Sequence, residues 1–358
     1  MSINKKIVIV GIQGVPAKYG GFESLVENLI GDNCPSDIHY TVFCSSKDYA
    51  ERLTEYKGAT LKYIPLHANG VQSIPYDMWG LVRSMRGYDA VVVLGVSGCL
   101  FLPIFRLMYR KKLIVNIDGL EHRRAKWGKM ARWVLRTSEA MAVRLADVVI
   151  ADNKGIQDYV WETYRRRAEL IAYGGDNVLR DVPMENQLKV LERYEVKNND
   201  YAITVCRIEP ENNSRMILEA FARSSRCLVF IGNWGHSDYG SSLKKEFGNK
   251  PNIHCIDAIY DLDTLFVLRA NAAYYIHGHS AGGTNPSLVE AMFFGKPILA
   301  FNVVYNRETT NNQAYYFSTS TELQQLLERT NLDGSLMKTY AMQHYTWRHI
   351  AKQYEDLY

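Results

Sequence analysis

The sequence predicts an α/β protein made of two doubly wound, Rossmann-like domains. Short runs rich in β-branched residues alternate with longer segments of helical periodicity, and this alternation stops and restarts once along the chain. Residues 91–94 are apolar without alternation, which is typical of a central parallel strand. The length of 358 residues favours two domains. With 47% hydrophobic and 22% charged residues, the composition excludes a disordered chain, a collagen-like chain and a disulfide scaffold.

The first domain is expected over residues 1–180. Its strands are predicted at residues 6–11, 40–44, 60–65, 90–94, 113–117 and 148–152. A polar linker near residues 177–195 leads into a second domain, residues 181–335. Its strands are predicted at residues 202–206, 227–232, 253–256, 273–276 and 297–300. The remaining residues, 336–358, are helical in pattern, and they end in an apolar stripe at helical spacing that begins at Trp347.

Positive charge gathers in the first half of the chain. Residues 1–180 carry 25 Lys and Arg against 18 Asp and Glu, and residues 106–136 hold ten basic residues but only two acidic ones. The expected helix that starts near Trp127 has an apolar face that includes Met130, while its basic residues and Trp133 lie elsewhere. Such a helix fits an anionic membrane surface or lipid diphosphate, and a solvated basic face is the alternative.

A glycine pair follows the first predicted strand. Gly20 and Gly21 stand where a helix begins, so backbone N–H groups there can approach a phosphate at the positive end of the helix dipole. The loop has neither the Gly-x-Gly-x-x-Gly spacing nor a Walker A sequence, which argues against a dinucleotide dehydrogenase or a P-loop enzyme. A simple tight turn is the alternative.

A second glycine loop follows the strand at residues 273–276. Asn285 is expected to cap the next helix, so that Gly283 and Thr284 offer backbone donors to an anion. Glu290 lies just over one turn into that helix, where its carboxylate can accept from ribose hydroxyls. Arg207 directly follows the strand at 202–206. If the anion is the diphosphate of a nucleotide, Arg207 can supply a fixed positive charge to it.

Asp118 follows the strand at residues 113–117, at the carboxyl edge of the first sheet, where doubly wound folds bind ligands. A carboxylate there can orient an acceptor hydroxyl or take up its proton. A turn or helix-capping aspartate is the alternative.

Four segments, residues 16–23, 118–127, 207–213 and 277–290, resemble the family 4 retaining glycosyltransferases of the GT-B fold. Within that family they resemble the bacterial rhamnosyltransferases that build cell-surface polysaccharides. The resemblance implies two domains facing across a cleft, with a C-terminal helix that crosses back to the first domain. It also implies acceptor-binding residues in the first domain: Tyr19, Glu121, His122, Arg123, Lys126 and Trp127.

Two positions depart from the family pattern. Gly282 replaces the first of two family glutamates, and Asn212 stands where a diphosphate-binding lysine is expected. We therefore expect Arg207 to be the main cation on the diphosphate, with Asn212 beside it. His279 becomes the catalytic candidate that contacts the transferred sugar, and a histidine hydrogen-bonded within its own loop is the alternative.

The resemblance implies transfer of L-rhamnose from dTDP-rhamnose, with retention, to a saccharide on a polyprenyl diphosphate, in O-antigen or capsule synthesis. Front-face attack would then require stabilisation of the leaving diphosphate. No Asp-x-Asp motif is present, so no metal and no cofactor are expected. The chain shows no signal peptide, and we expect it in the cytoplasm, peripheral at the inner face of the membrane, without a nucleic-acid partner. The alternatives are a glycosyltransferase for another UDP- or GDP-sugar, a nucleotide-sugar 2-epimerase and a non-catalytic nucleotide-sugar-binding protein.

Overall fold

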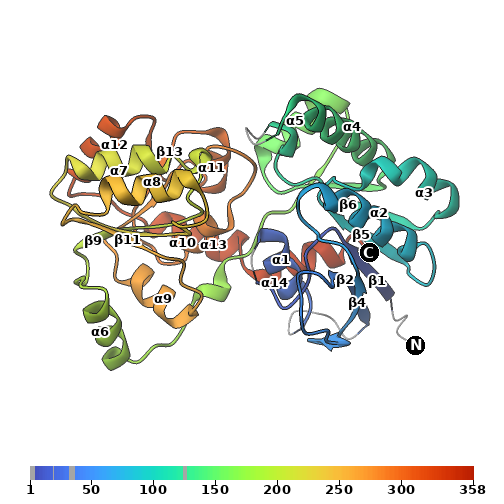
Figure 1. The fold of residues 1–358 in the computed structure, drawn as a ribbon, viewed down its shortest axis with the longest axis horizontal. Coiled ribbons are helices and arrows are strands. Elements are labelled where there is room, and N and C mark those ends of the chain that lie inside the picture. The colour runs from blue at the N-terminus through green and yellow to red at the C-terminus, as the bar shows by residue number, and fades with distance from the viewer. Residues whose placement is uncertain (1–4, 19, 32–36, 124–126) are drawn as a thin grey trace. The chain divides into compact units, whose positions relative to one another are not determined.

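The structure is a computed structural model that describes residues 5–18, 20–31, 37–123 and 127–358. It divides into two compact units (Figure 1). The first unit comprises Met1–Tyr173 together with Trp347–Tyr358, and the second comprises Gly174–Thr346.

The first unit is built on an eight-stranded sheet with the order β3-β4-β2-β1-β5-β6-β7-β8. Every pair of neighbours is parallel except β3 and β4. The strands are β1 (Lys5–Val10), β2 (Ile38–Ser45), β3 (Glu55–Tyr56), β4 (Ala59–Ile64), β5 (Ala90–Leu94), β6 (Lys112–Asn116), β7 (Val148–Ala151) and β8 (Glu169–Leu170). The strand order reverses between β1 and β5, which makes the carboxyl edge of these two strands a topological switch point.

Helices cover both faces of this sheet. They are α1 (Gly21–Leu29), α2 (Ser73–Ser84), α3 (Leu102–Met108), α4 (Lys129–Leu145), α5 (Lys154–Tyr164) and α14 (Trp347–Glu355), with short 3₁₀ turns η1 (Gly70–Gln72), η2 (Cys99–Phe101) and η3 (Glu121–Arg123). Alternate residues of β1 face opposite layers, because side chains in a strand have a period of two. Ile7 and Ile9 belong to the core that α1 and α14 cover, whereas Val10 packs against Gly80 of α2.

The C-terminal helix α14 belongs to the first unit. Trp347, Ile350 and Tyr354 are buried in its core beside α1 (Figure 1). The end of the chain is tied to the sheet as well, since Lys5 Nζ donates to the carbonyl oxygen of Tyr358 at 2.9 Å.

The second unit has a six-stranded, all-parallel sheet with the order β11-β10-β9-β12-β13-β14. Its strands are β9 (Tyr201–Val205), β10 (Cys227–Ile231), β11 (Ile253–Ile256), β12 (Tyr274–His277), β13 (Ile298–Phe301) and β14 (Tyr315–Phe317). The order reverses between β9 and β12, so the second switch point lies at the carboxyl ends of these two central strands.

Helices also lie on both faces of the second sheet (Figure 1). They are α6 (Met184–Arg193), α7 (Ser214–Ala222), α8 (Asp238–Phe247), α9 (Leu262–Ala270), α10 (Pro286–Met292), α11 (Val304–Thr309), α12 (Ser320–Leu327) and α13 (Ser335–His344), with 3₁₀ turns η4 (Asp176–Val178) and η5 (Pro210–Asn212). The apolar residues of α7, α8 and α12 form one core with the sheet. The predicted doubly wound α/β fold class is therefore confirmed for both units.

The structure corrects four details of the sequence prediction. The first unit ends at Tyr173 rather than near residue 180. Most of helix α13 falls in residues 336–358, yet it belongs to the second unit, where it packs against α10 and its Met337 is buried. Strands β3, β8 and β14 were not predicted, because each is only two or three residues long. Met130 is exposed, since it lies about 140° around α4 from buried Leu135.

Candidate functional site

Two loops meet at the switch point of the second unit. Arg207 follows β9, and His279 follows the neighbouring strand β12. The loops approach closely at Gly278, where a Cβ atom would lie 2.1 Å from the carbonyl oxygen of Asn212. Glycine is therefore required at this position, and it lets one loop rest on the backbone of the other.

Asn212 links Arg207 to His279. Its Nδ2 donates to the carbonyl oxygen of Arg207 at 2.8 Å, and its Oδ1 lies 2.7 Å from Nδ1 of His279. Because Oδ1 can only accept, the proton of this bond belongs to Nδ1 of His279. Asn306 Nδ2 donates at 2.8 Å to the His279 carbonyl oxygen and holds the residue from the other side. Both the orientation and the tautomer of the His279 ring are thus fixed.

The Arg207 side chain remains open to solvent. It forms an ion pair with Glu209, with Nη1 and Oε1 3.6 Å apart and both side chains more than a third exposed. Such a pair contributes little to stability, so little would be lost if Arg207 turned to an anionic ligand.

Glu290 is held by a buried arginine. Nη2 of Arg269, near the end of α9, donates to Oε2 of Glu290 at 2.6 Å, and Arg269 is buried whereas Glu290 is partly exposed. This bond engages Oε2, so Oε1 of Glu290 is left to accept a further hydrogen bond. Asn285 caps α10 as predicted, since its side-chain oxygen accepts from the backbone N–H of Ser287 at 3.0 Å.

Sequence reasoning missed Arg269 and also His277. The signal for Arg269 is a basic residue within the apolar run that precedes β12. His277, the last residue of β12, is buried, and its Nε2 has no hydrogen-bond partner among the described residues. Burial, and secondarily the neighbouring His279, lower the pKa of His277 well below its usual value. The lowered pKa favours the neutral form of the His277 ring, whose centroid lies 6.1 Å from that of the His279 ring.

In the first unit, the glycine loop closes over a buried carboxylate. Glu23, in the first turn of α1, accepts from the backbone N–H of Gln13 at 2.8 Å. Gly20 has a φ of 124°, and a Cβ atom there would lie 2.0 Å from Oε2 of Glu23, so only glycine fits. Burial raises the pKa of Glu23, and the nearby charge of Asp118 raises it further. Gly21, the first residue of α1, completes the turn.

Asp118 follows β6 in a left-handed backbone conformation, with a φ of 62°. Non-glycine residues adopt this region rarely, and such residues cluster at functional sites. Its backbone N–H donates to Oδ1 of Asn116 at 3.1 Å, and Nδ2 of Asn116 donates to the hydroxyl oxygen of Tyr354 at 2.9 Å. Helix α14 thus supports the loop that carries Asp118.

The predicted acceptor residues after Asp118 are held in two separate contacts. Nε1 of Trp127 donates to Oε1 of Glu121 at 3.0 Å. His122 Nδ1 lies 3.0 Å from Oε2 of buried Glu139. Although burial opposes it, hydrogen bonds from His122, Tyr164 and Tyr159 lower the pKa of Glu139. The Arg123 guanidinium lies over the Tyr159 ring at 4.8 Å, so this cluster anchors η3 to α4 and α5.

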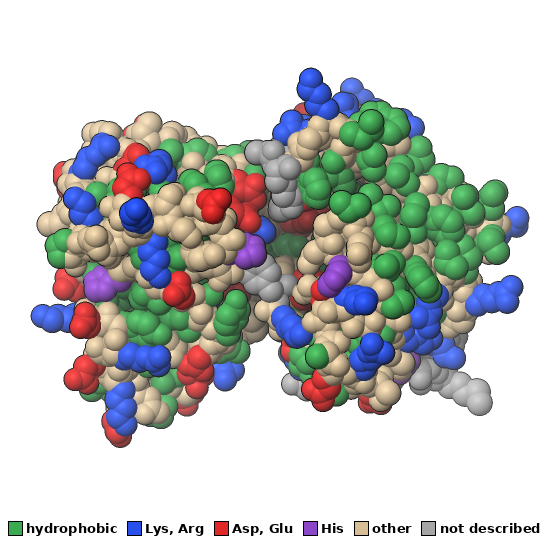
Figure 2. All heavy atoms as spheres, viewed as in Figure 1, with side chains coloured by type: hydrophobic (Ala, Val, Ile, Leu, Met, Phe, Trp, Pro, Cys, Tyr) green, Lys and Arg blue, Asp and Glu red, His purple; other side chains and the backbone are tan. Residues whose placement is uncertain are grey.

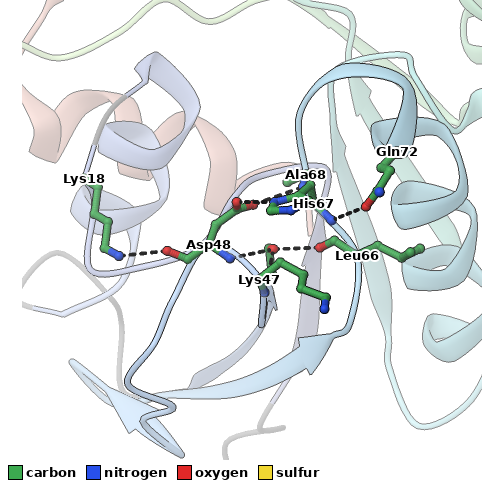
Figure 3. A network of polar contacts seen from close by, with 8 residues as sticks. Lys18, Lys47, Asp48, Leu66, His67, Ala68 and Gln72 are labelled. Atoms are coloured by element: carbon green, nitrogen blue, oxygen red, sulfur yellow. Dashed lines mark hydrogen bonds and ion pairs between the residues drawn. The ribbon is translucent and has the colours of Figure 1, made fainter.

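A further polar network stands at the same edge of the first sheet (Figure 3). Asp48, just after β2, contacts Nδ1 of His67 at 2.7 Å and accepts from the N–H of Ala68 at 3.2 Å. Although burial opposes it, these bonds and one from Ser45 lower the pKa of Asp48. Lys18 Nζ donates to the carbonyl oxygen of Asp48 at 2.9 Å. The network ties the glycine loop to the loops after β2 and β4, and sequence analysis did not predict it.

The structure therefore gathers the predicted residues at two sheet edges. Arg207, Asn212, His279 and Glu290 stand in the second unit, along with Gly283 and Thr284, which precede the Asn285 cap. Gly20, Gly21, Asp118 and the acceptor residues stand in the first. Tyr19 and Lys126 lie outside the described residues. The individual roles of all these residues remain predictions.

Two other features bear on this choice of site. A hollow of about 670 Å³ beside Arg223 and Cys227 lies at the amino ends of β9 and β10, the edge opposite to Arg207, so it does not include the predicted residues. Among the described residues, none of the helices is both long and apolar enough to cross a bilayer.

Comparison with known proteins gives separate matches for the two parts of the chain. Residues 4–176 match a family described as a domain of unknown function, DUF1972, and residues 189–332 match glycosyl transferases group 1. An uncharacterized glycosyltransferase from Methanocaldococcus jannaschii is 21% identical over 279 residues, which cover 71% of this chain and 69% of that protein.

Solved structures share the whole fold. Sucrose-phosphate synthase from Thermosynechococcus elongatus superposes with a TM-score of 0.81 at 15% identity, covering 99% of this chain and 98% of that one. HepE from Anabaena, solved in complex with UDP, gives a TM-score of 0.75 at 17% identity and covers 98% of both chains.

The two doubly wound sheets and these structural likenesses place the chain in the GT-B fold class. Within that class, the match over residues 189–332 identifies a glycosyl transferases group 1 domain in the second unit. This match covers the second unit only, and the first unit matches the domain of unknown function.

Proposed function

We propose that this glycosyltransferase transfers L-rhamnose, with retention, from dTDP-rhamnose to a saccharide carried on a polyprenyl diphosphate, in the synthesis of a surface polysaccharide. The single observation that carries the donor half is the set of Arg207, His279 and Glu290 at the switch point of a group 1 glycosyltransferase domain. HepE, a structural neighbour, has been solved with UDP and with UDP-glucose, which supports a nucleotide-sugar donor. The sugar and the lipid carrier rest on the family resemblance.

Two side chains would hold the donor, a cation at its diphosphate and a hydrogen-bond acceptor at its nucleoside. Arg207, which has only a weak partner in Glu209, would bind the diphosphate. The second carboxylate oxygen of Glu290, whose carboxylate Arg269 orients, would accept from the free hydroxyl of the deoxyribose. His279, whose Nδ1 proton points to Asn212, would present Nε2 to the sugar as a hydrogen-bond acceptor when the ring is neutral.

Transfer would then break the bond between the anomeric carbon and the diphosphate oxygen. A new bond forms from the acceptor hydroxyl oxygen to that carbon, on the same face. The hydroxyl proton passes to the departing diphosphate oxygen, whose charge Arg207 stabilises. Asp118 would orient the acceptor hydroxyl, a role that suits a carboxylate held in a left-handed turn at a sheet edge.

The test begins with the donor. Binding of dTDP, UDP and GDP is measured by calorimetry and by thermal shift, because a ligand that prefers the folded state raises the melting midpoint. Preference for dTDP, followed by rhamnose transfer from dTDP-rhamnose to a lipid-linked saccharide, is the expected result. Preference for UDP or GDP would overturn the rhamnose assignment but leave the donor site in place. Conversion of a nucleotide sugar at C2 without any acceptor would instead identify a 2-epimerase.

A further inference from the structure

Three helices of the first unit expose a broad apolar surface. Figure 2 shows apolar side chains over the region that α3 and α4 occupy in Figure 1, with basic side chains at its margin. We call this surface the apolar face. It comprises seven large exposed side chains: Trp79 and Val82 of α2, Ile104, Leu107 and Met108 of α3, and Met130 and Trp133 of α4.

The residues of the apolar face are not scattered, because they lie on helices that are packed together. Helix α3 packs against α4, and the turn η2 that precedes α3 packs against both α2 and α4. Within α3, Ile104, Leu107 and Met108 are spaced as one helical stripe, on the side away from buried Leu102. Leu107 is 79% exposed and Trp133 is 65% exposed. Soluble proteins seldom expose such contiguous patches unless they bind something there.

The exposed charged residues of the same helices are all basic. The acidic residues of α2, α3 and α4 are Asp77 and Glu139, and both are buried. Exposed basic residues accompany the apolar ones: Arg83 in α2, and Lys129, Arg132, Arg136 and Arg144 in α4. The outer surface of these helices is thus apolar and cationic without a compensating carboxylate.

We propose that the apolar face docks this glycosyltransferase on an anionic lipid bilayer. Leu, Met and Trp side chains of such a surface enter the boundary between headgroups and acyl chains, while Lys and Arg attract anionic headgroups. Symmetric pairing with a second copy is the weaker arrangement, because a two-fold interface would bring the basic residues of α4 against themselves. This inference rests on the proposed function, since a polyprenyl-linked acceptor would lie in the same bilayer.

The experiment uses the full chain and sedimentation with vesicles of phosphatidylcholine, with and without phosphatidylglycerol. The apolar variant is Leu107→Gln/Met108→Gln/Trp133→Gln. It should reduce binding to the anionic vesicles by about 10-fold or more, because three inserted side chains become polar. The matched control is Met184→Gln/Leu188→Gln in α6, whose side chains are 68% and 59% exposed on the second unit, and it should bind as the unaltered chain does.

A charge variant separates the two contributions. Lys129→Gln/Arg136→Gln should weaken binding to phosphatidylglycerol vesicles several-fold, and added salt should reduce this difference because it screens surface charge. Unchanged vesicle binding in the apolar variant would overturn the proposal. So would a dimer, seen by analytical ultracentrifugation, that the apolar variant dissociates without any loss of vesicle binding.

The same variants keep this inference separate from the proposed function. The apolar variant should bind nucleotide and transfer sugar to a short, soluble acceptor at the unaltered rate, because its changes lie outside the predicted sites. If the unaltered chain binds vesicles but transfers no sugar, the proposed function fails and the docking surface stands. If it transfers sugar but does not bind anionic vesicles, the docking surface fails alone.

Discussion

The sheet edges of the two units are built from different chemistry. In the second unit, hydrogen bonds of an amide and an imidazole group bind the two loops together, as Asn212 does between Arg207 and His279. In the first unit, the equivalent edge holds the carboxylates of Glu23 and Asp118, one of them buried and the other in a left-handed turn. The edge of the second unit is thus held by hydrogen bonds between its loops, whereas the edge of the first is acidic and contains a strained turn.

This contrast assigns different tasks to the two edges. A site fixed by buried hydrogen bonds is suited to hold a ligand with little reorganisation. A carboxyl group whose pKa is raised by burial and by a neighbouring carboxylate, as that of Glu23 is beside Asp118, is suited to handle hydroxyl groups and protons. Changes in the first unit should therefore alter turnover, and changes in the second should alter donor affinity.

The largest effect is expected from Asp118→Asn, which tests whether the first unit serves the reaction. Turnover should fall about 100-fold or more, in the range for loss of an acid–base group, while dTDP affinity stays within about two-fold. Steady-state kinetics and calorimetry on the same preparation measure both. Near-normal transfer with an earlier melting midpoint would make Asp118 a structural turn residue and remove the functional contrast.

Arg207→Ala should give the next largest effect, on donor affinity. Loss of a charge-assisted contact with the diphosphate should weaken dTDP binding roughly 10- to 100-fold. The control is Arg207→Lys, which keeps the charge but loses the planar fork, and it should recover part of the affinity. Equal affinity in all three proteins would show that the diphosphate is bound elsewhere.

Arg269→Met should have a smaller effect, through Glu290. Removing the buried arginine leaves the Glu290 carboxylate without its orienting donor, so dTDP affinity should fall several-fold. Free thymidine should show the same loss, because the contact with the deoxyribose and not the contact with the diphosphate is affected. The double change Arg269→Met/Glu290→Gln should unfold at higher denaturant concentration than Arg269→Met alone, since it removes the unpaired charge. Independent, additive effects would show that the pair is not coupled.

The parts of this fold that could be predicted from the sequence are those with a local residue pattern. The strand at residues 90–94 has a continuous β-branched run, and the structure places β5 at the same residues. The cap at Asn285 follows from its place before Pro286 and a helical pattern. The two-residue strand β8 has exposed side chains and no such signal, so only pairing with β7 reveals it.

The position of the candidate residues at the two sheet edges could be predicted, but their contacts could not. Ligands of doubly wound folds bind at the carboxyl edge, so the strand ends pointed to Arg207 and Asp118. The pairing of Arg269 with Glu290 depends on how two helices pack on one face, which periodicity does not encode. The proximity of Glu23 to Asp118 likewise arises from strand order, because β1 and β6 both lie beside β5.

The smallest expected effect concerns Glu23, and it tests the acidic character of the first edge directly. The pKa of Glu23 is raised above 4.5 in the folded chain. At a pH between 4.5 and the folded-state pKa, the folded chain therefore keeps a proton that the unfolded chain has lost. Its contribution to stability is therefore fully present below pH 4.5 and is lost as the pH rises through the folded-state pKa. Glu23→Gln, which keeps an oxygen for the N–H of Gln13, should flatten that part of the curve of unfolding free energy against pH. Asp118→Asn should lower the pKa of Glu23, followed by carbon NMR of its carboxyl group, by removing the neighbouring charge. A Glu23 titration that does not change in Asp118→Asn would mean that burial alone sets its pKa, and the two carboxylates would then act independently.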